Sequence, residues 1–325
     1  MNTFKLAQPQ TVDQVAALLA APRSGFFLMA GGTDLLDEMK SGVVSPEVVV
    51  DLQGVQGLAG ITAEKDGLRI GAMTTVAKLA VDPTVARDHP GLRQAALSLA
   101  SPQLRAVGTV GGNLCQRPRC WYYRDPQVVC RKKGGSRCFA ARGRNKYHAI
   151  FGGGICHIVF PSDLAPMLIS LGARVDVGGA GGEKTLLLEE FYQLPSANVR
   201  RENVLEPGQF VRGVKIPAPK AGQKSVYVKL KERGTWDFAL VSAAVTAVVS
   251  GKKLSTISVV MGGVAPIPWR LKKAEDILRG QPVTEDLIKR AAAEALKDAN
   301  PLAENGYKTK LLAAALKQAI LGLVA

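Results

Sequence analysis

The sequence predicts an α+β protein in three parts: two units that mix strands and helices, and a C-terminal unit in which strands precede helices. Three observations support this prediction. A strand, a glycine turn, a helix and a second strand follow one another within residues 26–51. An Asp-Gly pair at residues 66–67, the strongest short hairpin signal, marks the second unit. The proline-rich stretch 216–222 is typical of a linker to the third.

The N-terminal unit begins with a predicted helix. Thr11 and Gln14 form a capping-box pattern ahead of the apolar run VAALLA. Residues 26–30 (FFLMA) are typical of a short buried strand, which the turn Gly-Gly-Thr-Asp connects to a helix over residues 35–40. Residues 48–51 are expected to form the next strand. The pattern indicates a compact strand-turn-helix-strand unit.

The second unit is predicted to contain a hairpin within residues 58–70 and, after an interruption at 109–156, a second hairpin from residues 173–177 and 183–187. Helices are expected to begin within 71–80 and to cover 91–100. In the third unit, strand candidates precede three helices; the candidates are residues 225–230, 238–249 and 255–262. One helix has an apolar face formed by Leu287, Ile288, Ala291, Ala292, Ala295 and Leu296.

Length and composition indicate a soluble globular chain of two or three domains. The chain has 325 residues, of which 47% are apolar and 21% are charged. The first ten residues have no apolar run of the kind found in secretory signals. The apolar C-terminus is interrupted by Lys317 and Gln318 and is too short to cross a bilayer. No internal repeat is visible.

Two glycine turns have the composition of a phosphate-binding site. Residues 31–34 follow a predicted strand and open a helix, so their backbone N–H groups can point at an anion. Residues 109–113 are predicted to form a second turn of this kind. Neither turn fits the dinucleotide fingerprint G-x-G-x-x-G or the P-loop, and such turns are also common structural punctuation. Together, the two turns could hold the two ends of one pyrophosphate.

All five cysteines lie in one segment: Cys115, Cys120, Cys130, Cys138 and Cys156. The odd count and low density argue against a disulfide scaffold. Apolar periodicity in the segment is too short for an element that packs by itself, which makes a metal centre the obvious candidate. The intervals after Cys120 are ten, eight and eighteen residues, unlike zinc ribbons or bacterial ferredoxins, yet four thiolates could still meet around a metal.

The remaining donors near the segment have simpler interpretations. Cys115 adjoins the second glycine turn and is interpreted as a buried, non-ligating side chain. His148 and His157 are rival ligands, although His157 directly follows Cys156 and is poorly placed to bind the same metal.

Positive charge is concentrated in the cysteine segment. The formal net charge is +15, and residues 117–146 contain ten basic residues against the single acid Asp125, which accounts for nine of those charges. A solvated face, nucleic acid, an acidic membrane surface and an acidic protein partner are all compatible with such a segment.

Several motifs resemble the FAD-binding subunit of the xanthine dehydrogenase/carbon monoxide dehydrogenase type of molybdenum hydroxylase. They are AGGTDLL (30–36), IGAMTTVAKL (70–79), TVGGNLCQ (109–116), PSDLAP (161–166), the series Lys229, Arg233, Asp237, Phe238 and Ala239, and GGVAPIPWRLKKAE (262–275). They follow the family's order and cover essentially the whole chain. The resemblance implies two α/β FAD-binding subdomains, 1–55 and 56–218, and a C-terminal α+β domain, 222–325, with a three-stranded antiparallel sheet.

The resemblance also implies cofactors and their residues. FAD would be bound by Ala30, Gly31, Gly32, Thr33, Asp34, Leu35, Thr109, Gly111, Gly112, Asn113, Asp163 and Lys229. Asp163 could equally be a helix N-cap, and Lys229 could lie on the exposed face of an edge strand. The cysteine insertion, at about 117–157, resembles that of the flavoprotein subunits of 4-hydroxybenzoyl-CoA reductase and periplasmic aldehyde oxidoreductases. It implies one [4Fe–4S] cluster on Cys120, Cys130, Cys138 and Cys156, with the nearby basic residues stabilising its reduced state.

The resemblance implies that the chain transfers electrons between the molybdenum and [2Fe–2S] subunits and an external acceptor or donor. The enzyme expected first is an aldehyde oxidoreductase, and the alternative is a 4-hydroxybenzoyl-CoA reductase-like enzyme. The expected assembly is a heterotrimer or a dimer of heterotrimers, without nucleic acid or membrane. The expected location is the cytoplasm, or the periplasm if a partner with a twin-arginine signal exports the chain. The alternatives are a stand-alone flavin oxidoreductase and a zinc-stapled nucleic-acid binder that uses residues 121–123 for stacking.

Overall fold

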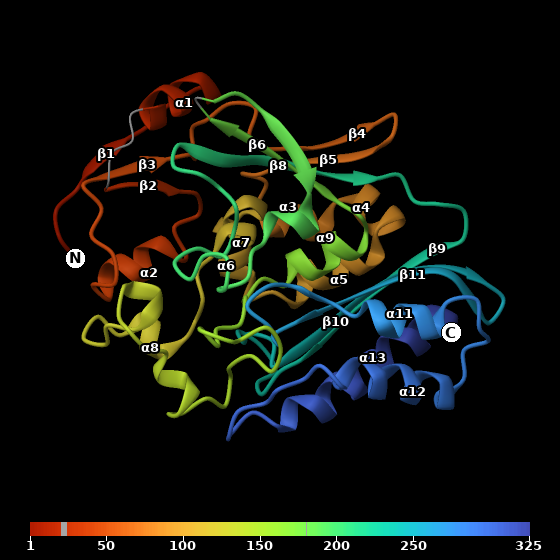
Figure 1. The fold of residues 1–325 in the computed structure, drawn as a ribbon. Coiled ribbons are helices and arrows are strands. Elements are labelled where there is room, and N and C mark those ends of the chain that lie inside the picture. Colours follow the sequence, from red (N-terminus) through yellow and green to blue (C-terminus); the bar gives the residue numbers. More distant parts are fainter. Residues whose placement is uncertain (21–24, 180) are drawn as a thin grey trace.

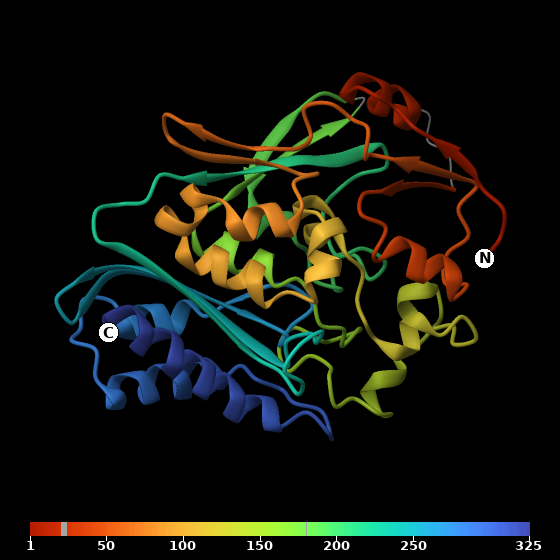
Figure 2. The same cartoon turned by 180° about the vertical axis from the view of Figure 1, so that it is seen from behind.

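The computed structural model describes residues 1–20, 25–179 and 181–325. Three sheets organise the chain, and each lies within one of the three predicted parts (Figures 1 and 2). The exact domain boundaries stay a prediction. Within the described ranges, the structure contains no helix that combines the length and apolar character needed to cross a membrane.

The N-terminal sheet has the strand order β1-β3-β2, with both pairs parallel. Its strands and helices are β1 (Lys5–Ala7), α1 (Val12–Ala20), β2 (Phe26–Met29), α2 (Leu35–Lys40) and β3 (Val48–Asp51). The predicted strand-turn-helix-strand unit is confirmed. β3 is the central strand, and three of its four residues are buried, which explains its unbroken run of valines.

The second sheet has the order β4-β5-β8-β6-β7 and is antiparallel throughout. Its strands are β4 (Ile61–Glu64), β5 (Gly67–Gly71), β6 (Arg174–Gly179), β7 (Lys184–Leu187) and β8 (Gln209–Pro217). Both predicted hairpins are present. The linker begins two residues later than predicted, because Ile216 and Pro217 are the last residues of β8 and pair with the hairpin strand β5.

A layer of short helices separates this sheet from the C-terminal one (Figure 1). The helices of the middle region are α3 (Val76–Val81), α4 (Pro83–Asp88), α5 (Pro90–Ser98), α6 (Pro102–Val107), α7 (Val110–Cys115), α9 (Leu164–Ser170) and α10 (Leu188–Phe191). α5 packs on β9 (Gln223–Leu230), and α9 packs on β10 (Val241–Ser250) and β11 (Lys253–Gly262). Every residue of α9 is buried, because sheets lie on both sides of this layer.

The C-terminal sheet has the order β12-β11-β10-β9. Its long strands β9 (Gln223–Leu230), β10 (Val241–Ser250) and β11 (Lys253–Gly262) form the predicted three-stranded antiparallel sheet, and the two-residue β12 (Trp269–Arg270) extends it. Its outer face is covered by α11 (Lys272–Leu278), α12 (Glu285–Leu296) and α13 (Tyr307–Val324) (Figure 2). The predicted apolar face of α12 is buried except for Leu296, which is half-buried.

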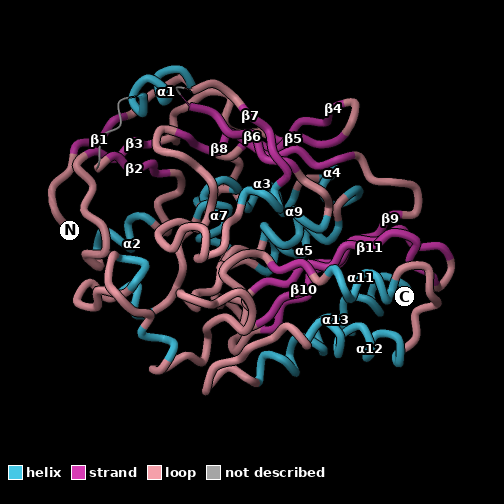
Figure 3. Tube along the Cα trace, in the orientation of Figure 1, coloured by secondary structure: helices cyan, strands magenta, loops and turns pink. Residues whose placement is uncertain are grey.

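The cysteine segment after α7, residues 117–157, forms a lobe of mostly loop beside the N-terminal unit and the C-terminal helices (Figure 3). It contains only the short helix α8 (Trp121–Arg124) and two single turns of 3₁₀-helix, Arg131–Lys133 and Phe139–Ala141. This agrees with the lack of sustained apolar periodicity in the sequence.

Candidate functional site: a glycine-lined cavity beside a cysteine cluster

The first glycine loop leaves β2 and opens α2, as predicted. Gly32 has a φ of +71°, a left-handed conformation that a side chain disfavours. Gly31 lies so close to the chain before α7 that a Cβ on it would overlap the carbonyl oxygen of Val107. The two glycines therefore allow the loop to turn sharply and to lie directly against the second predicted turn.

The second glycine stretch differs from the prediction. Gly111 and Gly112 lie inside the first turn of α7, and the preceding element is helix α6, so this is not a strand-to-helix turn. Thr109 caps α7, since its hydroxyl oxygen accepts a hydrogen bond from the N–H of Gly112 at 3.1 Å. Asn113 is fixed by the hydroxyl of Ser162, which donates to its side-chain oxygen at 2.6 Å.

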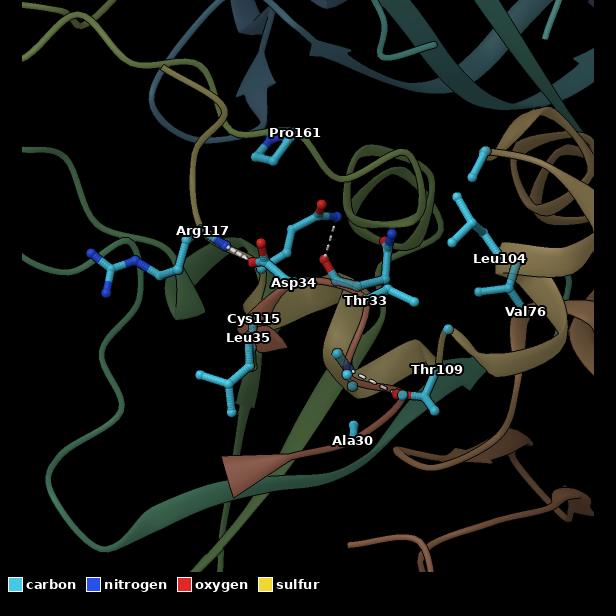
Figure 4. Close-up of a pocket in the computed structure, with 18 of the residues that line it drawn as sticks. Ala30, Thr33, Asp34, Leu35, Val76, Leu104, Thr109, Cys115, Arg117 and Pro161 are labelled. Carbon is cyan, nitrogen blue, oxygen red and sulfur yellow. Dashed lines mark hydrogen bonds between the residues drawn. The ribbon is translucent and has the colours of Figure 1, made fainter. Parts of the chain in front are cut away.

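The two stretches line one cavity of about 720 Å³ (Figure 4). Its lining contains eleven of the twelve predicted FAD-binding residues: Ala30, Gly31, Gly32, Thr33, Asp34, Leu35, Thr109, Gly111, Gly112, Asn113 and Asp163. The cavity therefore brings together loops about eighty residues apart in sequence, as the two-turn hypothesis requires. Its size falls within the range typical of small-molecule and cofactor sites.

The first loop offers unpaired hydrogen-bond donors to this cavity. Within the described part of the chain, the backbone N–H groups of Gly31, Gly32, Thr33 and Asp34 donate no hydrogen bond to protein atoms. In the second stretch, by contrast, the N–H of Gly111 is bound to the carbonyl of Ala72 at 2.7 Å. Consecutive free backbone donors form an anion-binding concavity, so the first loop has the chemistry to hold a phosphate.

Asp34 lines the cavity, but its carboxylate is already bound by the cysteine segment. Arg119 lies 2.8 Å from Oδ1 and Arg124 lies 2.7 Å from the same oxygen. The N–H of Arg117 donates to Oδ2 at 2.6 Å (Figure 4). Both carboxylate oxygens thus accept hydrogen bonds from residues directly around Cys120.

Lys229, the twelfth predicted residue, does not line the cavity. Its ammonium group donates to Asp163 at 2.8 Å and to the carbonyl of Ser98 at 3.2 Å, and the Lys229 and Asp163 side chains are only 3% and 5% exposed. Lys229 is therefore buried, although β9 is an edge strand. The hydroxyl of Tyr227 also donates to Asp163, at 2.7 Å. Asp163 makes no side-chain cap; Ser162 accepts the N–H of Ala165 in that role.

Several cavity residues were not predicted as ligands. The loop that follows β9 contributes Arg233, Trp236, Asp237 and Phe238, and Trp236 is 63% exposed. Trp236 has a φ of +50° and its N–H donates to the carbonyl of Ala100, whose φ is +47°. These are the two non-glycine residues with positive φ in the described ranges, and strained backbone of this kind is enriched at functional sites. No sequence pattern indicates that strain.

The four predicted metal ligands lie together. Cys120, Cys130, Cys138 and Cys156 all line one small cavity, whereas Cys115 lines the large one instead. His148 also faces the small cavity, with Nε2 at 3.2 Å from Sγ of Cys120. His157 is not part of that lining. Four of the five cysteines therefore share one cavity and the fifth lines another, and which of them bind metal stays a prediction.

The thiols have different protonation behaviour. Burial raises the pKa of Cys115 to about 12 and that of Cys120 to about 11. A hydrogen bond between Cys138 and Cys156 lowers the pKa of Cys138 and raises that of Cys156. In the described residues, no three side chains of His, Cys, Asp or Glu converge as they would around a single metal ion. Four cysteines and His148 therefore line one cavity without converging on one point in the described residues.

Much of the positive charge in the segment is neutralised locally. Arg119 and Arg124 pair with Asp34, while Arg117 and Lys132 pair with Glu202 at 2.8 and 2.5 Å. These four basic residues hold the segment to the rest of the chain. They are thus less available to stabilise a negative centre than the sequence suggested.

A third cavity, of about 380 Å³, lies between the other two. It shares Arg119, Pro161, Arg233, Asp237 and Phe238 with the large cavity, and it shares Cys120 and His148 with the cysteine cavity. Arg119 and Cys120 are neighbours in sequence. One peptide unit therefore connects the walls of all three cavities.

Comparison with known proteins defines the class. Residues 2–219 match the family described as "FAD binding domain in molybdopterin dehydrogenase", and residues 225–323 match "CO dehydrogenase flavoprotein C-terminal domain". The chain belongs to this family of FAD-binding medium subunits of molybdenum hydroxylases, and it is a flavoprotein subunit of an oxidoreductase complex.

Individual relatives narrow the comparison. The chain is 36% identical to the aldehyde oxidoreductase FAD-binding subunit PaoB of Escherichia coli K12, over 96% of this chain and 95% of that protein. It is 27% identical to the carbon monoxide dehydrogenase medium chain of Afipia carboxidovorans, over 98% and 96%. The solved structure of the reconstituted CO dehydrogenase from Oligotropha carboxidovorans superposes with a TM-score of 0.79 at 26% identity, covering 98% of this chain and 97% of that one.

Proposed function

We propose that this chain is the FAD- and [4Fe–4S]-containing electron-transfer subunit of a multi-subunit molybdenum hydroxylase of the aldehyde oxidoreductase type. The observation that carries the proposal is the adjacency of two sites. The glycine-lined cavity and the four-cysteine cavity are connected through the Arg119–Cys120 peptide. A chain with one site for a flavin and another for an iron–sulfur centre is suited to passing electrons between them.

FAD is supported by the family and by the chemistry of the large cavity. Four free backbone donors in residues 31–34 can bind the pyrophosphate without a basic side chain. The loop with Trp236 and Phe238 offers aromatic surface, and apolar side chains such as Leu104 and Val76 line the remaining wall. A cavity that combines phosphate-binding amides with apolar and aromatic walls is suited to a dinucleotide that carries flat rings.

The cluster is supported by the donor set. Four cysteines line one cavity within a segment that has few apolar contacts of its own, and metal–ligand bonds can supply folding free energy in such a segment. The absence of a three-residue convergence in the described ranges disfavours a single zinc ion. It does not disfavour a cubane, whose thiolates bind different iron atoms and so do not meet at one point.

The cofactors would supply the redox chemistry: flavin exchanges one or two electrons, and a [4Fe–4S] cluster exchanges one at a time. The chain itself binds and orients them. The buried hydrogen bonds from Lys229 and Tyr227 fix Asp163, which lines the flavin cavity. The organic substrate would be oxidised on a molybdenum subunit, with a [2Fe–2S] subunit between, in a heterotrimer or a dimer of heterotrimers.

An absorption spectrum with metal and flavin analysis tests the proposal. The purified full-length chain should contain one FAD and about four iron atoms, as one [4Fe–4S] cluster requires. Its spectrum should show flavin bands on a broad iron–sulfur shoulder. Flavin without iron would contradict the proposed cluster and leave the flavin-subunit assignment intact, and zinc in place of iron would contradict the [4Fe–4S] assignment.

The substrate class rests on the relative PaoB, whose name identifies an aldehyde oxidoreductase. The 4-hydroxybenzoyl-CoA reductase-like enzyme remains the second candidate, because its flavoprotein subunit resembles this one in the cysteine insertion. The complete complex should oxidise aromatic or aliphatic aldehydes with an artificial acceptor. If it instead turned over only an aromatic acyl-CoA thioester, the second candidate would replace the first. The isolated chain should turn over neither substrate.

A further inference from the structure

The link between the two cofactor sites is made by one carboxylate. Asp34 stands at the end of the glycine loop, directly before α2. Its side chain is 18% exposed and reaches across to the residues that flank Cys120. Both of its oxygens are occupied, Oδ1 by Arg119 and Arg124, and Oδ2 by the N–H of Arg117.

Arg119 and Arg124, which bind the Asp34 carboxylate, are both largely buried. Arg124 is 13% exposed and Arg119 is 26% exposed. Burial lowers the pKa of Arg119, with Asp34 as its principal opposing charge. Arg124 also donates to the carbonyl of Pro118 at 2.9 Å, so it holds the chain just before Cys120. Charge-assisted hydrogen bonds of this length are among the stronger contacts in a protein.

The same surface of α2 adds two further contacts, neither of which involves the glycine loop. Glu38 accepts the hydroxyl hydrogen of Tyr123 at 2.7 Å, and Asp37 lies 3.2 Å from Arg124. Asp37 is 59% exposed, so its ion pair is screened by solvent and contributes little. Asp34 is thus the contact that joins the glycine loop to the chain around Cys120.

We propose that the carboxylate of Asp34 is a positioning group that couples the two sites: the carboxylate itself binds no cofactor, and it transmits the order of the cysteine segment to the backbone amides of the glycine loop. This inference rests on the proposed function. When the four cysteines are metallated, residues 117–124 are fixed and hold Asp34, and through it the free amides of residues 31–34, in the arrangement that binds phosphate. When iron is absent, that arrangement is less populated. FAD affinity and iron content are therefore linked, and the linkage is reciprocal.

The experiment measures FAD dissociation constants for iron-loaded and iron-free full-length chain, in wild type and in Asp34→Asn. In wild type, iron removal should weaken FAD binding about tenfold, a typical coupling between sites. In Asp34→Asn, iron-loaded and iron-free protein should bind FAD with the same affinity, close to that of the iron-free wild type. A direct FAD ligand at Asp34 would instead lower both affinities by one factor and keep the tenfold ratio, which would overturn the proposal.

Two further variants keep the test sharp. Arg124→Met lies outside the flavin cavity lining and should abolish the iron dependence as Asp34→Asn does. Asp37→Asn, on the same helix and touching the same arginines, is the matched control and should keep the dependence. An unchanged dependence in Arg124→Met would contradict the proposal even if Asp34→Asn failed to fold. If wild-type protein bound no FAD or no iron, the proposed function itself would be wrong.

Discussion

The glycine-lined cavity and the cysteine segment are held together in opposite ways. The cavity wall is built on sheets and helices with a continuous apolar core, which includes Leu79, Leu92 and Met167. The segment has almost no core of its own: its contacts are ion pairs to Asp34 and Glu202 and rings that pack on one another, such as Tyr122 stacked on Phe139. From this contrast we expect the cavity to be preformed and the segment to depend for its stability on the proposed cluster.

The C-terminal domain supports the segment through polar contacts as well. The side chain of Asn305 donates to the carbonyls of His148 and Ala149, and the buried Lys308 donates to the carbonyl of Tyr147 at 2.9 Å. These groups satisfy backbone oxygens of a loop that has no sheet to pair with. The segment is therefore positioned in part by its neighbours.

The largest effect is expected for replacements of the clustered cysteines, because these variants test whether the segment depends on a metal centre for its stability. Single replacement of Cys130 or Cys156 by Ser should reduce iron to near zero and make residues 117–156 sensitive to protease, because the segment loses its stabilising centre. FAD should persist with reduced affinity. Iron analysis and limited proteolysis are the measurements. Cys115→Ser is the control and should keep about four iron atoms per chain, since Cys115 lines the other cavity.

The reverse pattern would change the ligand assignment. If Cys115→Ser lost its iron while Cys156→Ser kept it, the assignment of four ligands and one bystander would be wrong.

The second prediction concerns the glycines that line the cavity and tests whether FAD lies between the two loops. Gly31→Ala forces a Cβ against the carbonyl oxygen of Val107, and Gly112→Val places a Cβ 3.0 Å from the hydroxyl oxygen of Thr109, which caps α7. Overpacking of this kind costs about 1–3 kcal/mol of folding free energy. If the loops recover their FAD-binding arrangement only by taking on that strain, FAD binding weakens roughly 5- to 150-fold. Titration of the flavin-free protein with FAD measures the dissociation constant. Gly306→Ala, where open space surrounds the new methyl group, should bind FAD as wild type does.

If Gly112→Val retained full stoichiometric FAD at wild-type affinity, the phosphate would not lie between these loops.

The third prediction concerns the ion pair that holds the far side of the segment. Lys132 and Glu202 are 1% and 4% exposed, so Lys132→Met leaves a buried carboxylate with only Arg117 as partner. Removing one member of a buried pair typically costs about 3–5 kcal/mol. The variant should lower the melting temperature of the iron-free chain. Lys133→Met is the matched control, because Lys133 donates to the backbone carbonyl of Asp125 at the surface. Equal melting temperatures for the two variants would show that this pair is not what anchors the segment.

The sequence predicted the local elements well where a pattern has one physical solution. The Asp-Gly hairpin, the glycine loop before α2 and the antiparallel C-terminal sheet are present as expected. Cys120, Cys130, Cys138 and Cys156 line one cavity, and their role as cluster ligands stays a prediction.

What the sequence could not give is the set of partners that only folding brings together. Asp34 was expected at the pyrophosphate, but its carboxylate is taken by arginines that lie more than eighty residues away in sequence. Lys229 was expected at the flavin or on an exposed face, but it is buried against Asp163. Gly112 was expected in a turn, but Thr109 caps a helix there. In each case a side chain of known chemistry met a partner that no local pattern specifies.

The smallest effect is expected for Trp236, which lies at the edge of the cavity, is 63% exposed and has a positive φ. Arg233 holds the residue in place, since its guanidinium group donates to the Trp236 carbonyl at 3.1 Å and lies 5.9 Å from the ring. If a flat cofactor ring fills the cavity beneath, Trp236 becomes buried on binding and contributes an aromatic contact of about 0.5–1.5 kcal/mol. Trp236→Phe should therefore weaken FAD binding only about two- to tenfold and should remove most of the quenching of tryptophan fluorescence by FAD. The control is Trp269→Phe, because Trp269 stacks on Phe151 away from the cavity and should leave both quantities as in wild type. Quenching that survived in Trp236→Phe and vanished in Trp269→Phe would place the flat ring elsewhere.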